Sequence, residues 1–168
     1  MDLGCGAEVP RVEGPTHRSM LSAPGCWALF GELLARLLRE PAAENLRRRC
    51  ADAFAVQHPG TSGPQAIQSV AGHLRSLYAQ FELGQSPVQA RASIEAVVRH
   101  EDILRWLSPP SSVGRIVVRD VVARPGSLDE AAREWALEAW LAWEPWHSQV
   151  RDWYRELAGP RYRPRTSA

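Results

Sequence analysis

Two cysteines and a histidine lie in a part of the sequence that has no helix or strand periodicity. Cys5 stands in "DLGCGAEVP", His17 in "GPTHRSM" and Cys26 in "APGCWALF", where a strongly apolar stretch begins. Thiolate sulfur and imidazole nitrogen are the ligands that zinc takes in structural sites. We therefore predict a metal site, with zinc as the ion, at Cys5, His17 and Cys26.

The residues offer one candidate for a fourth ligand. Asp2 lies three positions before Cys5, where zinc knuckles usually have a second cysteine, and a carboxylate oxygen also binds zinc. Glycines flank Cys5 and precede Cys26, which allows the backbone to turn tightly beside a ligand. The alternative is that both cysteines are small buried residues and that His17 belongs to an ordinary loop.

A second group of polar residues falls inside the helical part of the sequence. Asp52 and His58 lie near the end of one predicted helix, and His73 flanks the apolar stripe of the next. Histidines from facing helices build internal metal or catalytic sites in bundles, so these three residues are a candidate acid–base pocket. The alternative is structural: His58 caps a helix end, and His73 bonds to a backbone carbonyl.

Five of the seven tryptophans lie between residues 135 and 153. Trp140 and Trp143 fall beside the apolar stripe of the last predicted helix rather than on it, and His147 follows Trp143 by one helical turn. Aromatic side chains suit a flat ligand or a partner helix, so these three residues are a candidate ligand groove. The alternative is that they belong to the core of the bundle.

Composition excludes several classes of function. The chain has 168 residues and a net charge of +1, whereas proteins that bind nucleic acid non-specifically usually have a strong basic excess. The sequence has neither a signal-peptide pattern nor an apolar run long enough to span a membrane. We expect a cytoplasmic protein with free or metal-bound cysteines, whose partner is a small molecule or a protein rather than nucleic acid or a membrane.

The apolar periodicity predicts an all-α bundle of about five helices in one domain, residues 1–168. Residues 1–25 form an irregular metal-binding loop, residues 26–158 the bundle and residues 159–168 a loose tail. "RIVVRDVV" at 115–122 is predicted as a short helix or turn. The predicted helices begin near Cys26 and then cover about 42–58, 65–83, 87–100 and 128–157, the last with a kink at Pro145.

The chain resembles an uncharacterised bacterial family of small helical proteins, a domain of unknown function. Three segments carry the resemblance: "GPTHRSMLSAPGCWALFGELLAR", "DAFAVQHPGTSGPQAIQSVAGHL" and "WALEAWLAWEPWHSQVRDW". Relatives often open with C-x-x-C-G, followed by G-P-T-H and P-G-C-W; the matching positions here are Asp2, Cys5, His17 and Cys26. The resemblance implies a Cys-Cys-His-Cys zinc site, from which this chain departs at Asp2, and it implies no known activity.

Three functions are compatible with these observations. The first is a zinc-binding helical protein whose metal is structural. The second is a metal-dependent enzyme of the hydrolase or transferase type, in which an open zinc position binds water or substrate and Asp52, His58 and His73 supply acid–base chemistry. The third is a metal-free bundle that binds a ligand or a protein in the tryptophan-lined groove.

Overall fold

The computed structural model describes residues 1–39, 43–98 and 101–157. In these residues the only regular structure is helical, which confirms the all-α class, and there are seven α-helices rather than about five. The predicted tail at 159–168 lies outside the described residues, as do positions 42 and 100, where two predicted helices begin or end. The helices are α1 (Pro24–Leu37), α2 (Glu44–Gln57), α3 (Pro64–Phe81), α4 (Pro87–Val97), α5 (Val118–Ala123), α6 (Leu128–Ala142) and α7 (His147–Leu157).

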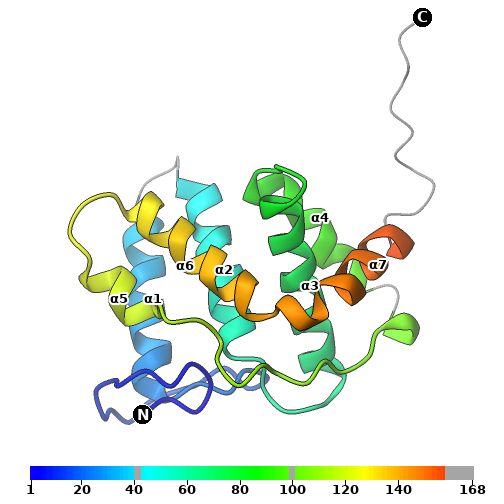
Figure 1. Ribbon diagram of the computed structural model, residues 1–168. Coiled ribbons are helices and arrows are strands. Elements are labelled where there is room, and N and C mark those ends of the chain that lie inside the picture. Colours follow the sequence, from blue (N-terminus) through cyan, green and yellow to red (C-terminus); the bar gives the residue numbers. More distant parts are fainter. Residues whose placement is uncertain (40–42, 99–100, 158–168) are drawn as a thin grey trace, which may run out of the picture.

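Residues 1–23 contain no helix and run along one end of the bundle (Figure 1). Proline and glycine are frequent in this segment and prevent a regular hydrogen-bond ladder. Helix α1 begins at Pro24, a residue suited to the first helical position because its missing N–H would have no partner there. The segment therefore ends one turn before the buried Cys26 side chain.

Helices α1 and α2 form an antiparallel hairpin (Figure 1). The start of α1 and the end of α2 consequently lie at the same end of the bundle, beside the N-terminal segment. Phe30 of α1 and Phe54 of α2 stack with their ring centroids 4.1 Å apart. This packing fixes the two helices where they approach the N-terminal segment.

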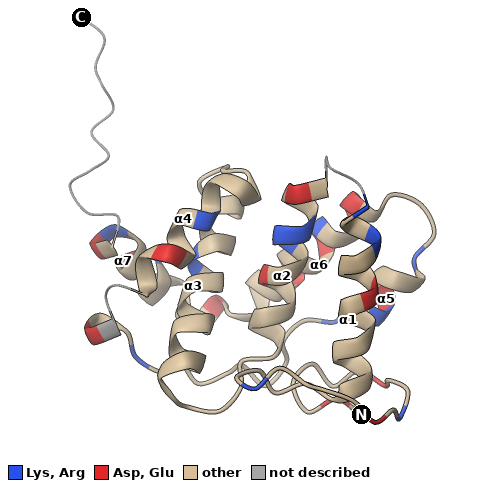
Figure 2. Ribbon diagram, turned by 180° about the vertical axis from the view of Figure 1, so that it is seen from behind, with Lys and Arg blue, Asp and Glu red and all other residues tan. Residues whose placement is uncertain are grey.

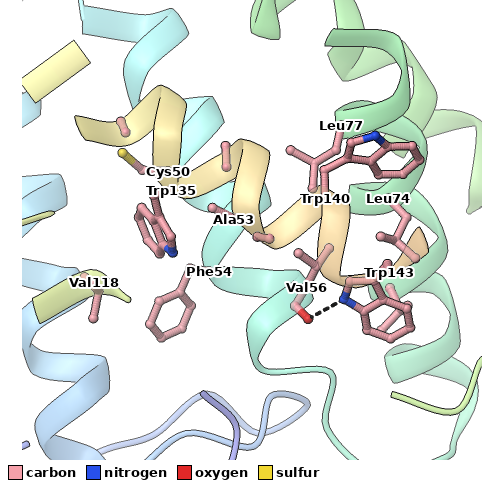
Figure 3. Close-up of a cluster of buried hydrophobic side chains, with 14 of the residues drawn as sticks. Cys50, Ala53, Phe54, Val56, Leu74, Leu77, Val118, Trp135, Trp140 and Trp143 are labelled. Atoms are coloured by element: carbon pink, nitrogen blue, oxygen red, sulfur yellow. Dashed lines mark hydrogen bonds between the residues drawn. The ribbon is translucent and has the colours of Figure 1, made fainter. Parts of the chain in front are cut away.

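Helix α6 packs against α2, and the buried side chains of Trp135, Trp140 and Trp143 belong to the core around α2, α3 and α6 (Figure 3). The buried indole N–H groups have partners, as low-polarity surroundings require. Trp135 donates to Gln57 Oε1 at 2.8 Å, and Trp143 donates to the Val56 carbonyl at 3.1 Å. Gln57 in turn donates to the carbonyls of Val113 and Ile116, so the end of α2 is bound to the extended segment before α5.

One continuous helix with a kink at Pro145 was predicted over 128–157, but the structure has two helices with a break at this proline. Helix α6 ends at Ala142, a short 3-10 helix η3 covers Glu144–Trp146, and α7 begins at His147. Proline lacks an N–H and its ring collides with the preceding turn, which explains the break. Residues 118–123 form the short helix α5, so the predicted short helix covers the second part of "RIVVRDVV", whereas Val117 before it is extended.

Acidic and basic residues are both distributed over the helices in Figure 2, and both signs occur on α2 and on α6. The formal net charge of +1 is the sum of 20 basic and 19 acidic residues. None of the described helices has the length and hydrophobicity needed to cross a membrane.

Candidate metal centre

Four side chains that can bind a metal converge where the N-terminal segment meets α1 and α2. They are Asp2, Cys5, Cys26 and His58, and one potential ligand atom from each lies within 4.8 Å of all the others. The two sulfurs are 3.8 Å apart, Cys26 Sγ is 3.4 Å from His58 Nε2, and His58 Nε2 is 3.2 Å from Asp2 Oδ1. The arrangement can accept a small cation at its centre.

A tight turn over residues 2–7 positions Asp2 and Cys5. The Gly6 N–H donates to the Asp2 carbonyl, and Gly6 has φ +72°, a conformation that favours glycine. The amides of Gly4 and Cys5 both donate to Asp2 Oδ1, at 2.8 and 2.9 Å. The first and last ligands of the D-x-x-C stretch are thereby oriented toward one point.

Gly4 allows this turn to lie directly against the end of α2. A Cβ atom built on Gly4 would overlap both the Leu21 carbonyl oxygen and the His58 ring. Gly25 makes a similar close approach, because a Cβ there would overlap the Pro10 carbonyl oxygen. These two positions hold glycine because the backbone must approach other groups closely, and the N-terminal segment then encloses the cluster.

His58 is oriented by its other ring nitrogen. Nδ1 lies 2.7 Å from the Phe54 carbonyl, so Nδ1 carries a proton and donates it, while Nε2 faces the cluster. The ring also stacks on Phe54 with the centroids 4.0 Å apart. A carbonyl that fixes the tautomer of a histidine in this way is typical of metal-ligating histidines.

The cluster is largely removed from solvent. Asp2 is 3% exposed, Cys26 0% and His58 1%, whereas Cys5 is partly exposed. Burial alone would raise the pKa of Asp2, but hydrogen bonds from His58 and from the amides of Ala23 and Cys5 outweigh it and lower that pKa well below the usual range. Asp2 is therefore ionised, and its two oxygens accept hydrogen bonds from the backbone amides of Gly4, Cys5 and Ala23.

The other three side chains, Cys5, Cys26 and His58, shift one another's pKa values through hydrogen bonds. A hydrogen bond from Cys26 is the main cause that lowers the pKa of Cys5 to about 6. The same hydrogen bond, together with burial, raises the pKa of Cys26 far above its usual value. Burial would lower the pKa of His58, but hydrogen bonds to Asp2 and Cys5 outweigh it and raise this pKa to about 9.

The structure brings together three of the four residues predicted as metal ligands, and it places His58 where His17 was expected. His17 lies outside the cluster, and its Nδ1 accepts a hydrogen bond from the Ser19 amide at 3.3 Å. Its ring packs against Trp27 with the centroids 5.4 Å apart. Within the described residues His17 therefore supports the loop that leads into α1 rather than the cluster itself.

The predicted acid–base pocket is divided between two sites. Asp52 and His73 are bonded, with Asp52 Oδ1 2.7 Å from His73 Nδ1, but His58 belongs to the metal cluster. The other oxygen of Asp52 accepts hydrogen bonds from Ser76 and Gln80, both at 2.7 Å. The Asp52 carboxylate is thus satisfied by side chains of α3 and joins α2 to α3.

The residues predicted as a ligand groove, Trp140, Trp143 and His147, are buried in the structure, with 2%, 0% and 7% of their surface exposed. Trp140 and Trp143 belong to the hydrophobic core. The His147 ring stacks on Trp140 with the centroids 3.6 Å apart, and its Nε2 lies 3.0 Å from the Trp140 carbonyl. The prediction assumed one continuous helix through all three residues, whereas α6 ends at Ala142 and α7 begins at His147.

A shallow open pocket with a cavity volume of about 210 Å³ lies between two loops, residues 18–21 and 60–66. None of the four cluster residues lines it. The cluster therefore does not form the floor of this pocket.

A family model described as "Family of unknown function (DUF5946)" matches residues 2–144. The chain belongs to this family. No curated protein and no solved structure shows a significant match to the chain. The region matched by the DUF5946 model includes all four cluster residues, from Asp2 to His58, and ends between α6 and α7.

In this member of DUF5946, the order of the helices along the chain indicates that His58 lies close to Cys26. Two consecutive helices with a short connection pack antiparallel, so the residue after the second helix lies near the start of the first. Cys26 lies in the first turn of α1, and His58 follows Gln57, the last residue of α2. Spacing along the chain hides this proximity, because 32 positions separate the two residues.

Proposed function

We propose that the protein binds one Zn²⁺ ion through Asp2, Cys5, Cys26 and His58, and that the ion is structural. In this role the metal joins the N-terminal segment to the start of α1 and the end of α2. The observation that supports the proposal best is the convergence of these four ligand atoms, drawn from three separate parts of the chain.

The distances between the ligand atoms favour tetrahedral zinc. With Zn–S near 2.3 Å and Zn–N near 2.0–2.1 Å, tetrahedral geometry separates two sulfurs by about 3.8 Å, and a sulfur and a nitrogen by about 3.5 Å. Cys5 Sγ and Cys26 Sγ are 3.8 Å apart, and Cys26 Sγ is 3.4 Å from His58 Nε2. An ion at the centre therefore requires little rearrangement of these three side chains.

The chemistry of the donor set also favours zinc. Two sulfurs, one imidazole nitrogen and one carboxylate oxygen are all established zinc ligands, whereas calcium and magnesium prefer oxygen alone. Free thiols at all three cysteines suit a reducing compartment, which supports a cytoplasmic location.

A structural role is favoured over a catalytic one because four protein ligands complete the tetrahedral shell. Catalytic zinc usually keeps three protein ligands and leaves the fourth position to water or substrate. Asp52 and His73, the other members of the predicted acid–base pocket, bond to each other and to α3 side chains instead. This distribution favours a zinc-stabilised binding or regulatory protein over a hydrolase or transferase.

The test is zinc stoichiometry on protein purified without a histidine tag. We expect one zinc per chain in the wild type, and tetrahedral thiolate absorption bands when Co²⁺ replaces it. The variants Cys26→Ser and Asp2→Asn keep the side-chain size and should lose or weaken zinc binding, whereas His17→Gln and Cys50→Ser should keep it. Zinc retained in Cys26→Ser, or zinc lost in His17→Gln with the fold intact, would contradict the ligand assignment.

Zinc affinity should fall as the pH falls. Around pH 7 the metal-free cluster carries a proton on Cys26, whose pKa is raised, and one on His58, whose pKa is raised to about 9. Zinc must displace both protons, so its binding releases about two protons. The zinc affinity should therefore fall roughly 100-fold for each unit by which the pH is lowered near neutrality. Calorimetric titration in buffers of different ionisation enthalpy measures this proton number; a value near zero would contradict it.

A further inference from the structure

We propose that Cys5 and Cys26 form a dithiol that peroxides oxidise to a disulfide, and that this oxidation releases the zinc ion. The zinc release rests on the proposed function, whereas formation of the disulfide requires only the two thiols. Oxidation and reduction of the two cysteines would then control how the N-terminal segment is attached to the bundle.

The two sulfurs are already close enough for bond formation after a small movement. They lie 3.8 Å apart, and a disulfide bond is about 2.05 Å long, so they must approach by less than about 2 Å. Cys26 lies in the first turn of α1, but Cys5 lies in the irregular N-terminal segment. A shift of the turn that carries Cys5 can therefore bring the sulfurs together without moving the helix.

Accessibility gives the two cysteines different roles. Cys5 is partly exposed, whereas Cys26 and Cys50 are both 0% exposed. The neighbouring Gly6 borders open space, since no atom lies within 4 Å of the position its Cβ would take. A small peroxide can therefore reach Cys5 from solvent, and Cys26 lies directly behind it as the resolving thiol.

The chemistry is balanced with hydrogen peroxide as the oxidant. The Cys5 sulfur attacks one peroxide oxygen, so an S–O bond forms, the O–O bond breaks and hydroxide leaves and is protonated to water. The Cys26 sulfur then attacks the Cys5 sulfenic acid; an S–S bond forms, the S–O bond breaks, and the leaving hydroxide takes a proton from the Cys26 thiol in the metal-free protein, or from solvent when Cys26 is a zinc-bound thiolate, and becomes a second water. The two cysteines lose two electrons, and one peroxide is reduced to two waters.

Oxidation removes two of the four zinc ligands at once. Asp2 and His58 remain, and one oxygen and one nitrogen cannot complete a tetrahedral shell. The disulfide keeps residue 5 attached to α1, while the metal-mediated link to the end of α2 is lost. We therefore expect the oxidised protein to differ from the zinc form mainly at the contact between residues 2–7 and His58.

The experiment exposes zinc-loaded wild-type protein to hydrogen peroxide and follows three quantities. Zinc release is measured with a chromophoric chelator, free thiols with a thiol reagent, and cross-linked peptides by mass spectrometry without reduction. We expect loss of two of the three thiols, a peptide linking Cys5 to Cys26, and one zinc released per disulfide. Reduction with dithiothreitol should restore both thiols and zinc binding.

The matched control is Cys50→Ser, which removes the third cysteine and should form the same disulfide with the same zinc release. Metal-free wild type and metal-free Cys5→Ser are treated in parallel, and only the first should form the linked peptide. Zinc loss without a Cys5–Cys26 link, or a link that includes Cys50, would overturn the inference. A link in metal-free protein that never binds zinc would support the dithiol and overturn the zinc function and its release.

Discussion

Removal of zinc by a chelator should lower the melting temperature of the protein by roughly 8–16 °C. A ligand that binds only the folded state stabilises it by about 4 kcal/mol when its free concentration is 1,000 times its dissociation constant. For a chain of this size each kcal/mol corresponds to about 2–4 °C. We expect a large loss because the proposed ion would link residues 1–23, which contain no helix, to the start of α1 and the end of α2.

Differential scanning calorimetry with and without the chelator measures this shift in melting temperature. Limited proteolysis identifies the part of the chain that loses stability. Without metal, cleavage should accelerate within residues 1–23 before it does in the helices. Cys26→Ser provides the control, since its melting temperature should already be low and should not respond to the chelator. Identical melting curves for zinc-loaded and zinc-free wild type would rule out a structural role for the ion.

Replacement of Trp143 by alanine should destabilise the fold by about 3–5 kcal/mol. The indole is 0% exposed, packs between α6, α2 and α3, and donates to the Val56 carbonyl at 3.1 Å (Figure 3). Alanine leaves a cavity and a buried carbonyl without its partner, and both effects reduce the free energy of unfolding. Urea denaturation gives the change directly.

Two further variants separate the contributions to this effect. Trp143→Phe retains most of the apolar volume and loses the N–H donor, so its cost should be clearly smaller than that of Trp143→Ala. Leu141→Ala, two positions earlier at a residue that is 55% exposed, should change stability by less than about 0.5 kcal/mol. A Trp143→Ala cost near that of Leu141→Ala would show that the indole does not belong to the core.

The helical architecture was predictable from apolar periodicity and from proline and glycine. Pro145 marked the break between α6 and α7, and Ser86 marked the start of α4, where its side chain accepts the Gln89 amide. Ser127 caps α6 in the same way by accepting the Glu130 amide. These features are local, so they depend on residues a few positions apart and are visible in the sequence itself.

The composition of the cluster was only partly predictable, because it depends on tertiary contacts. Asp2, Cys5 and Cys26 occur in glycine-containing stretches where a turn around an ion is expected. His58 and His17 are chemically equivalent as ligands, and only the antiparallel packing of α1 and α2 decides between them. The tryptophans were ambiguous for the same reason, since helical spacing does not tell how much of a helix its neighbours cover.

The order of the cluster residues along the chain determines when the centre can be completed during synthesis. Asp2 and Cys5 leave the ribosome first, Cys26 follows, and His58 emerges only after the whole of α2. Until then the growing chain presents two thiols and a carboxylate without the imidazole that completes the set. The two thiols are therefore exposed to mispairing and to thiophilic metals during this interval, and loading of the proposed zinc site becomes a step that follows packing of α2 against α1.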